Sequence, residues 1–291
     1  MGDGVTTCYE LSVVIPAKNE AENLRKLLPE LLELLPNAEV IVVDDGSTDA
    51  TQAVLEKFQV KSIKHPVSLG NGAAIKSGAR ASNGDYIVFM DGDGQHDPSL
   101  IPRLLSKLDE GFDLVVGARN SEGQASFSRG LANRFYNWFA SKVTGFKIQD
   151  LTSGFRVVSA EKFKKFLYLL PNGFSYPTTS TMAFLRSGFR VSYVDIPVYR
   201  RVGKSHIKPI RDGIRFLIII FKIATLYAPL KVFLPIATLS FGLGLARYGY
   251  TYATLGTFTN MSALLFVTSV QIFLIGLVAE QITSLIYKDI N

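Results

Sequence analysis

Cysteine and tryptophan each occur once in this 291-residue chain, and histidine occurs three times. The single cysteine, Cys8, excludes an internal disulfide and any zinc site built from several cysteines. His65, His96 and His206 lie far apart and show none of the spacings of metal-binding histidines. No charged segment followed by a short apolar run opens the chain, so we expect the N-terminal domain to stay in the cytosol.

Hydrophobic residues make up 47% of the chain and are concentrated after about residue 214. The part before them has the composition of a soluble domain, so we expect one large α/β domain with an appendage. The net charge of +6 is uneven, with eight Lys or Arg against one acid between Tyr199 and Lys231. This basic cluster leads into apolar segments and carries no nucleic-acid motif, which favours a membrane surface or a phosphate as partner over nucleic acid.

Apolar runs alternate with helical patterns as far as Arg119; beyond it the pattern changes, and two further strands with helices between them are expected. The expected strands are Leu11–Pro16, Val40–Val43, Val60–Lys64, Tyr86–Met90, Leu114–Gly117, Phe155–Val158 and Arg190–Val198. The expected helices are Ala21–Leu35, Asp49–Phe58, Gly70–Ala81, Pro98–Glu110 and Arg129–Thr144. Alternation of this kind predicts a parallel sheet with helices on both faces, and the lack of polar alternation within the strands agrees with cover on both faces.

Two carboxylates, Asp91 and Asp93, follow one of these strands and lie among glycines. A strand that ends in this way places them at the carboxyl edge of an open α/β sheet, where ligands bind. Carboxylate oxygens at that edge suit Mg²⁺ or Mn²⁺ holding a diphosphate. A solvated acidic turn is the alternative, and the motif alone does not decide between them.

The basic cluster continues into apolar segments. Residues 207–224 carry apolar and basic side chains on separate stripes, which predicts an amphipathic helix in the membrane interface, with packing on the domain as the alternative. Two longer segments, about 230–252 and 261–287, approach the ~20 residues that cross ~30 Å of hydrocarbon. Their short connection predicts a hairpin, and the basic residues before it and Lys288 after it place both ends in the cytoplasm. A buried helical pair in a soluble oligomer is the alternative.

Seven short motifs precede these segments: Val14-Ile-Pro-Ala-Lys-Asn-Glu20, Asp44-Asp-Gly-Ser-Thr-Asp49, Gly70-Asn-Gly72, Asp91-Gly-Asp-Gly-Gln-His-Asp-Pro98, Gly117-Ala-Arg119, Asp150-Leu-Thr-Ser-Gly-Phe-Arg156 and a basic loop from Arg200 to Ser205. In this order they resemble the family-2 glycosyltransferases of the GT-A fold. More narrowly, the chain resembles the polyprenyl-phosphate sugar synthases, the group of dolichyl-phosphate-mannose synthase and its undecaprenyl-phosphate relatives. The resemblance implies a cytosolic Rossmann-like GT-A domain over 1–206, a juxtamembrane helix over 207–226 and a transmembrane hairpin over 227–291.

The resemblance also implies roles for individual residues. A divalent ion is implied at Asp91 and Asp93, with Gln95 as its companion. The implied nucleotide-sugar pocket comprises Pro16, Ala17, Glu20, Asp45 and Asp91, and two cations that close over the diphosphate, Arg201 and Lys204. The implied contacts to an acceptor phosphate are Arg119, Arg129 and Asn133. The implied catalytic residues are Asp150, Asp93 and Arg119.

The implied reaction is a metal-dependent, inverting transfer of a hexosyl group from GDP-mannose or a UDP-hexose to dolichyl or undecaprenyl phosphate. A phosphate monoester has its second pKa near ~6 and is largely dianionic at neutral pH. It therefore needs placement and charge screening more than it needs a base. Asp150 resembles the family's proposed base or sugar-orienting carboxylate, and the pKa of the phosphate favours the orienting role.

Some features leave alternatives open. Many relatives have a glutamate where this chain has Lys204, and His96 is predicted to be a loop residue and not a ligand. A processive polysaccharide synthase is a second candidate, but Trp138 does not lie in the Gln-x-x-Arg-Trp motif of those enzymes. A membrane-anchored nucleotide-binding module without turnover is a third. The sequence does not decide the sugar, the lipid, or whether the chain forms a homo-oligomer.

Overall fold

The structure is a computed structural model that describes residues 10–119, 127–173, 175–197, 218, 221–222 and 225–288, with the backbone alone for 127–133. The chain divides into two compact units. The first comprises Met1–Asn137 and Ile148–Ile207, and the second comprises Trp138–Lys147 and Lys208–Asn291. Most of the predicted amphipathic helix lies outside the described residues.

The first unit is built on a single sheet of seven strands in the order β3-β2-β1-β4-β6-β5-β7. The strands are β1 (Leu11–Ala17), β2 (Glu39–Asp44), β3 (Lys61–Lys64), β4 (Tyr86–Phe89), β5 (Leu114–Arg119), β6 (Arg156–Ser159) and β7 (Val191–Ile196). Each corresponds to a run predicted from the sequence. The four strands β3, β2, β1 and β4 are parallel, so their carboxyl ends share one edge.

The sheet is mixed: β1 to β5, for which the sequence predicted a parallel sheet, run in one direction, and β6 runs against them. This strand is antiparallel to both of its neighbours, β4 and β5. Its first residue, Arg156, pairs with Phe89 near the end of β4 and with Val116 in β5. A central strand is buried on both faces whichever way it runs, so its apolar run carries no signal of direction. The reversal brings the segment before β6 to the edge where β4 ends.

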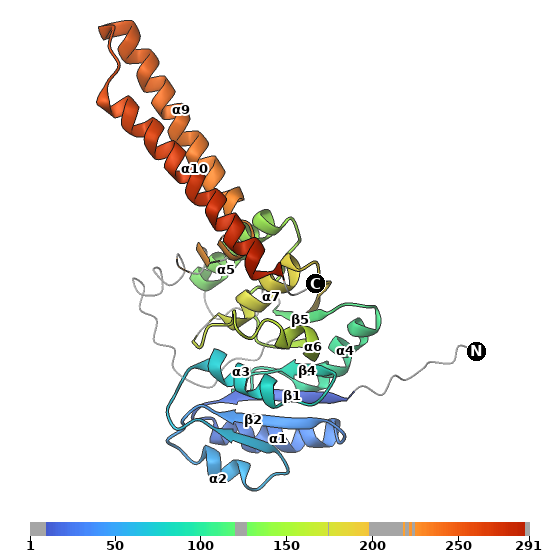
Figure 1. The fold of residues 1–291 in the computed structure, drawn as a ribbon. Coiled ribbons are helices and arrows are strands. Elements are labelled where there is room, and N and C mark those ends of the chain that lie inside the picture. The colour runs from blue at the N-terminus through green and yellow to red at the C-terminus, as the bar shows by residue number, and fades with distance from the viewer. Residues whose placement is uncertain are drawn as a thin grey trace, which may run out of the picture. The chain divides into compact units, whose positions relative to one another are not determined.

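Helices cover both faces of the sheet, as predicted. The helices of the first unit are α1 (Ala21–Leu34), α2 (Thr51–Leu55), α3 (Asn71–Ala81), η1 (Pro98–Leu100) leading into α4 (Ile101–Asp109), α6 (Ala160–Lys164) and α7 (Tyr176–Arg186). One further helix, α5 (Phe127–Thr144), is divided between the two units. Figure 1 shows β1, β2 and β4 side by side with α1 and α3 near them. Only α2 is clearly shorter than expected.

The side chains of β1 show how the two faces are filled. Val13 and Ile15 join an apolar core with α1, including Leu24 and Leu28. Val14 points to the other face, where α3 packs so closely that a Cβ added to Gly78 would collide with it. The small residues of α3 therefore allow close contact with the sheet and hold its N-terminal turn at the sheet's edge.

The second unit contains two long helices, α9 (Pro229–Leu255) and α10 (Asn260–Ile286), which form the predicted hairpin (Figure 1). Both are long and apolar enough to cross a membrane, and only 17% of the apolar window in each is buried. Glu280, which interrupts the second apolar segment, accepts a hydrogen bond from the backbone N–H of Leu230 at 3.3 Å. That N–H lies in the first turn of α9, where no helical partner exists for it.

Small residues form the seam between α9 and α10. Their buried positions recur every seven residues, at Ala237, Gly244 and Thr251 in α9 and at Ser262, Ser269, Gly276 and Thr283 in α10. Ser269 donates a hydrogen bond to the carbonyl of Ala237 at 3.0 Å. A seven-residue repeat keeps one stripe facing the partner helix, and small side chains let membrane helices approach closely. Many large apolar side chains of both helices are exposed, among them Leu239, Leu243 and Ile275.

Candidate active site

A cavity of about 440 Å³ lies at the carboxyl ends of β1, β2 and β4. Six of the residues predicted for the nucleotide sugar and metal line it: Pro16, Ala17, Glu20, Asp45, Asp91 and Asp93. Lys18, Ser68 and the start of α3 complete much of its wall. The parallel direction of these strands explains the gathering, because their ends meet at one edge of the sheet.

Asp45 is held by protein groups on both of its carboxylate oxygens. Oδ1 accepts from His65 Nδ1 at 2.7 Å and from the N–H of Leu69 at 2.8 Å, while Oδ2 accepts from Ser68 Oγ at 2.7 Å and from the N–H of Gly70 at 2.9 Å. Burial opposes ionisation, but these hydrogen bonds, led by that from His65, outweigh it and lower the pKa of Asp45 to about 2. Asp45 is therefore a fixed anion at one end of the cavity.

Asp91 and Asp93 supply the two carboxylates at the other end. A Cβ added to Gly154 would lie 2.7 Å from Asp91 Oδ2, so this glycine leaves room for the carboxylate. Asp93 Oδ1 accepts the N–H of Gln95 at 3.1 Å. Within the described part of the chain no cluster of three or more His, Cys, Asp or Glu could hold a metal. Two carboxylates fit Mg²⁺ or Mn²⁺, which keep further positions for phosphate and water.

The loop that carries these carboxylates rests on a buried histidine. His96 Nδ1 accepts the backbone N–H of Asp91 at 3.3 Å, and its ring stacks on Phe155 with centroids 5.1 Å apart. Burial lowers the pKa of His96 to about 4, against the opposing charges of Asp93 and Asp150. His96 is a loop residue as predicted. Its hydrogen bond to the Asp91 backbone and its stacking on Phe155 also hold this loop in place, which the sequence did not indicate.

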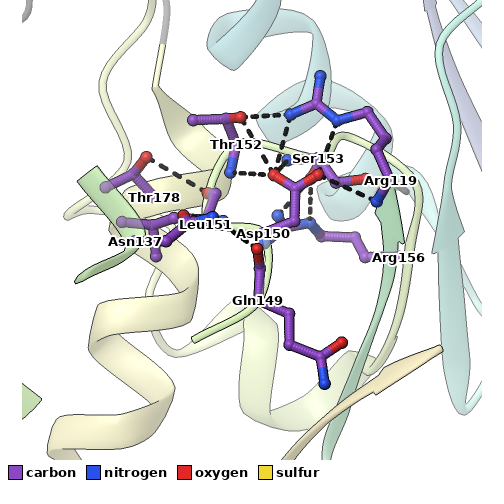
Figure 2. A network of polar contacts seen from close by, with 9 residues as sticks. All are labelled: Arg119, Asn137, Gln149, Asp150, Leu151, Thr152, Ser153, Arg156 and Thr178. Carbon is purple, nitrogen blue, oxygen red and sulfur yellow. Dashed lines mark hydrogen bonds and ion pairs between the residues drawn. The ribbon is translucent and has the colours of Figure 1, made fainter. Parts of the chain in front are cut away.

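Arg119 and Asp150 form a two-point ion pair at the end of β5 (Figure 2). Arg119 Nε donates to Asp150 Oδ2 at 2.6 Å, Nη2 donates to Oδ1 at 2.9 Å, and the backbone N–H of Arg119 donates to Oδ2 at 3.2 Å. Arg119 Nη2 also donates to Thr152 Oγ1. Asp150 thus occupies the guanidinium edge formed by Nε and Nη2.

The turn that follows Asp150 donates to the same carboxylate. Oδ1 accepts from the N–H of Thr152 at 3.0 Å, from its hydroxyl at 3.2 Å and from the N–H of Ser153 at 3.1 Å. Burial would raise the pKa of Asp150, but the hydrogen bond and charge of the Arg119 side chain and the backbone N–H groups of Thr152 and Arg119 lower it. Asp150 also raises the pKa of Arg119 against the effect of burial. The pair is ionised and fixed in orientation.

The remaining predicted site residues are not brought to the cavity by the described part of the chain. Gln95 is half-buried but does not line the cavity. Arg129 and Asn133 lie in α5 where only the backbone is described, and Arg201 and Lys204 lie outside the described residues. Sequence reasoning missed His65 and Arg156; the only signal for the second was its place at the end of the Asp150 motif.

The mixed sheet and the acidic cavity at its carboxyl edge define a glycosyltransferase domain of the GT-A fold. Residues 12–167 match the family described as glycosyl transferase family 2. The chain belongs to this family. Residues 228–285 match a second family, the GtrB C-terminal hairpin, and this range covers most of α9 and α10. The fold class and the family resemblance expected from the sequence are both confirmed.

Two relatives illustrate the similarity. The glycosyltransferase AglJ of Haloferax volcanii is 27% identical over 288 residues, which cover 94% of this chain and 93% of that protein. The undecaprenyl-phosphate 4-deoxy-4-formamido-L-arabinose transferase of Proteus mirabilis is 35% identical over 151 residues, which cover 48% of this chain and 46% of that protein. The first similarity thus extends over nearly the whole chain and the second over about half.

A similar fold occurs in glucosyl-3-phosphoglycerate synthase from Mycobacterium tuberculosis, solved with Mn²⁺ and UDP-glucose. The TM-score is 0.60 at 22% sequence identity, and the match covers 75% of this chain and 78% of that chain. At this identity the likeness establishes the fold alone.

Proposed function

We propose that this enzyme transfers a hexosyl group from a nucleotide-diphosphate sugar to a polyprenyl phosphate, with inversion at the anomeric carbon. The nucleotide sugar occupies the cavity between Asp45 and Asp91. The acceptor phosphate lies near Arg119 and Asp150. The two α9 and α10 helices cross the membrane, with the catalytic unit on the cytoplasmic side.

One observation carries the proposal: the start of β6 lies between the Asp91 carboxylate and the Arg119–Asp150 ion pair. Arg156 pairs with both β4 and β5, the strands that lead to Asp91 and Arg119. Gly154, two residues earlier, adjoins the Asp91 carboxylate, while Ser153 donates to Asp150. A donor diphosphate at Asp91 and an acceptor at Arg119 would therefore be neighbours, as a single displacement requires.

The acceptor class is supported by the hairpin and by the relatives. A lipid phosphate is presented at a membrane surface, and two helices of membrane-spanning length follow the catalytic unit. The Proteus relative is named for an undecaprenyl-phosphate acceptor. The Mycobacterium synthase supports a nucleotide sugar with Mn²⁺ at this fold, and the Asp91 and Asp93 carboxylates fit either Mn²⁺ or Mg²⁺.

The chemistry follows from the charges. A lipid phosphate is already largely ionised at neutral pH, so no base has to create the nucleophile. A divalent ion at Asp91 and Asp93 would neutralise the diphosphate leaving group. Asp150, held ionised by Arg119, is suited to orient the sugar or the acceptor and not to exchange protons. Arg119 adds positive charge beside the acceptor phosphate. Arg129, Asn133, Arg201 and Lys204 remain proposed contacts to the substrates.

The test is a transfer assay with the full-length chain in detergent or proteoliposomes. GDP-mannose, UDP-glucose and UDP-N-acetylglucosamine are each incubated with Mn²⁺ and either dolichyl or undecaprenyl phosphate, and the lipid is identified by mass. We expect one donor to yield a lipid heavier by one hexosyl residue, and Asp93→Asn to yield almost none. Release of nucleotide without glycosylated lipid, or extension of a polysaccharide, would reject the proposal.

A further inference from the structure

Arg156 is a charged side chain that no water reaches, with an exposed fraction of 0%. Its Nε donates to the carbonyl of Ser153 at 3.2 Å, and Nη2 donates to the same carbonyl. Its Nη1 donates to the carbonyl of Pro177 at 2.9 Å, to Ser180 Oγ at 2.8 Å and to Thr181 Oγ1 at 3.2 Å. Every one of these acceptors is neutral.

Within the described part of the chain, the positive charge of Arg156 has no counter-ion in contact. Among the described residues no carboxylate oxygen lies within 4.0 Å of its guanidinium. Five hydrogen bonds, together with the ring of Tyr176 whose centroid lies 5.7 Å from Arg156 Cζ, offset part of the cost of burying this ion. None of these partners supplies a negative charge, so the charge of Arg156 acts on the site around it.

Two carboxylates that act on the charge of Arg156 belong to the active site. Burial lowers the pKa of Arg156, whereas Tyr176, Tyr193, Asp150 and Asp91 act in the opposite direction, and of these four only the two carboxylates carry a charge at neutral pH. Figure 2 shows the Arg156 side chain next to Asp150 and Ser153. Because β6 runs antiparallel to β4 and β5, its first residue, Arg156, pairs with Phe89 and Val116, close to the strand ends that lead to Asp91 and Arg119.

Ser153 connects Arg156 to the Asp150 turn. The N–H of Ser153 donates to Asp150 Oδ1 at 3.1 Å, while its carbonyl accepts from Arg156 through both Nε and Nη2. Ser153 is thus held from two sides. On its other side Arg156 is anchored to the first turns of α7, which is buried along almost its whole length.

We propose that Arg156 is a positioning residue that holds the Asp150 turn through Ser153 and whose buried charge offsets the negative charge of Asp91 and Asp150. This inference rests on the proposed function for its meaning in catalysis. Both proposed substrates are anions and must enter a site that already contains carboxylates. The charge of Arg119 is matched by Asp150 in contact. The charge of Arg156 meets no carboxylate in contact among the described residues and acts on the site as a whole.

The proposal makes two predictions of opposite sign. A cation behind Asp91 weakens the binding of a free divalent ion and strengthens the binding of an anionic nucleotide. Removing the charge should therefore tighten Mn²⁺ binding and weaken nucleotide binding. A scaffold that merely loosens would weaken both.

The experiment compares Arg156→Met and Arg156→Gln, which remove the charge, with Arg156→Lys, which keeps it. Mn²⁺ binding to the full-length chain in detergent is measured by the EPR signal of free Mn²⁺, and UDP and GDP binding is measured in EDTA. For both neutral variants we expect Mn²⁺ to bind about threefold tighter or more, and nucleotide to bind correspondingly weaker. Arg156→Lys, which retains a cationic head group but not the guanidinium's donors, should change both measurements less than the neutral variants do. The glutamine variant retains a donor for Ser153 and serves if methionine prevents folding.

Thr179→Ala is the control for a change in the packing of α7 that leaves the contacts of Arg156 intact. Thr179 and Thr181 are both buried in α7 and both donate to a carbonyl four residues earlier, but only Thr181 contacts Arg156. Thr179→Ala should leave Mn²⁺ and nucleotide binding unchanged. Mn²⁺ binding that is unchanged or weaker in both neutral variants would overturn the proposal. Since neither measurement requires transfer, a failure of the proposed function appears separately, as a wild-type chain that never glycosylates lipid.

Discussion

Arg119 and Asp150 meet in a two-point ion pair, with Nε to Oδ2 at 2.6 Å and Nη2 to Oδ1 at 2.9 Å. The Asp150 carboxylate is 7% exposed and also accepts from the turn that follows it, so it is an oriented anion with little freedom to rotate. A guanidinium matches a carboxylate in this planar geometry, which a lysine cannot reproduce. The pair fixes the direction of Asp150 beside the proposed acceptor site.

Asp150→Asn should lower the rate of transfer on the order of 100-fold, because an amide offers Arg119 one acceptor oxygen in place of two and the oriented anion is lost. If the acceptor phosphate is already ionised, a higher pH should not restore the rate. The measurement is a pH–rate profile of wild type and variant at saturating donor. An alkaline limb that rises only in Asp150→Asn would instead make Asp150 a general base.

Asp91→Asn and Asp93→Asn should each remove most turnover while the chain stays folded, and EDTA should do the same reversibly.

Gly154→Ala should weaken the metal site without removing a ligand, since its Cβ would lie 2.7 Å from Asp91 Oδ2 and displace that carboxylate. We expect Gly154→Ala to need several-fold more Mn²⁺ for half-maximal activity. Gly173→Ala, whose Cβ would meet nothing within 4 Å, is its control. Full activity of wild type in EDTA would reject the metal site.

The acid stability of the first unit should depend on Asp45. Its pKa is lowered to about 2, below the ordinary value, so the stabilisation it provides is complete above about pH 4 and is lost as the pH falls towards 2. The loss for this carboxyl is on the order of 2 kcal/mol. Melting temperatures of wild type and Asp45→Asn at pH 5 and pH 2.5 measure it. We expect the variant to lose less stability on acidification, and equal losses would contradict the assignment.

The hairpin seam can be tested with two glycines. A Cβ on Gly276 would lie 2.7 Å from Phe233 Cβ, whereas a Cβ on Gly242 would meet nothing within 4 Å. Alanine improves helix propensity at both positions by up to about 1 kcal/mol, so the difference between them isolates packing. Gly276→Ala should lower the melting temperature in detergent by overpacking, at a cost of about 1–3 kcal/mol. Gly242→Ala should not. Equal shifts in the two variants would show that α9 and α10 do not pack along this seam.

The hairpin also shows a signal that was present in the sequence and was not used. The lengths of the two apolar segments predicted α9 and α10 closely, because hydrophobicity over about 20 residues is a local property. The seven-residue recurrence of small residues from Ser262 to Thr283 could have indicated which face of α10 packs. The hydrogen bond from the backbone N–H of Leu230 to Glu280 could not be anticipated, since the two residues lie 50 positions apart in the sequence and on different helices.

The sequence by itself determined the strands, the helices and the carboxylates at the strand ends. Apolar runs and the turn residues around them act locally, and parallel strands bring their carboxyl ends together without further information. Asp45, Asp91 and Asp93 therefore reached one cavity as expected. The order of the motifs was enough to indicate the family.

Only the tertiary structure decided the direction of β6, the pairing of Arg119 with Asp150, and the burial of His65, His96 and Arg156. A strand covered on both faces has the same apolar pattern in either direction, so its orientation depends on how the chain returns to the sheet. Hydrogen bonds between residues 20 or more positions apart, such as those from His65 to Asp45 and from Arg119 to Asp150, depend on that same path. The charge of Arg156 can be buried because the carbonyls and hydroxyls that receive it come from a turn and from α7, which meet only in the folded chain.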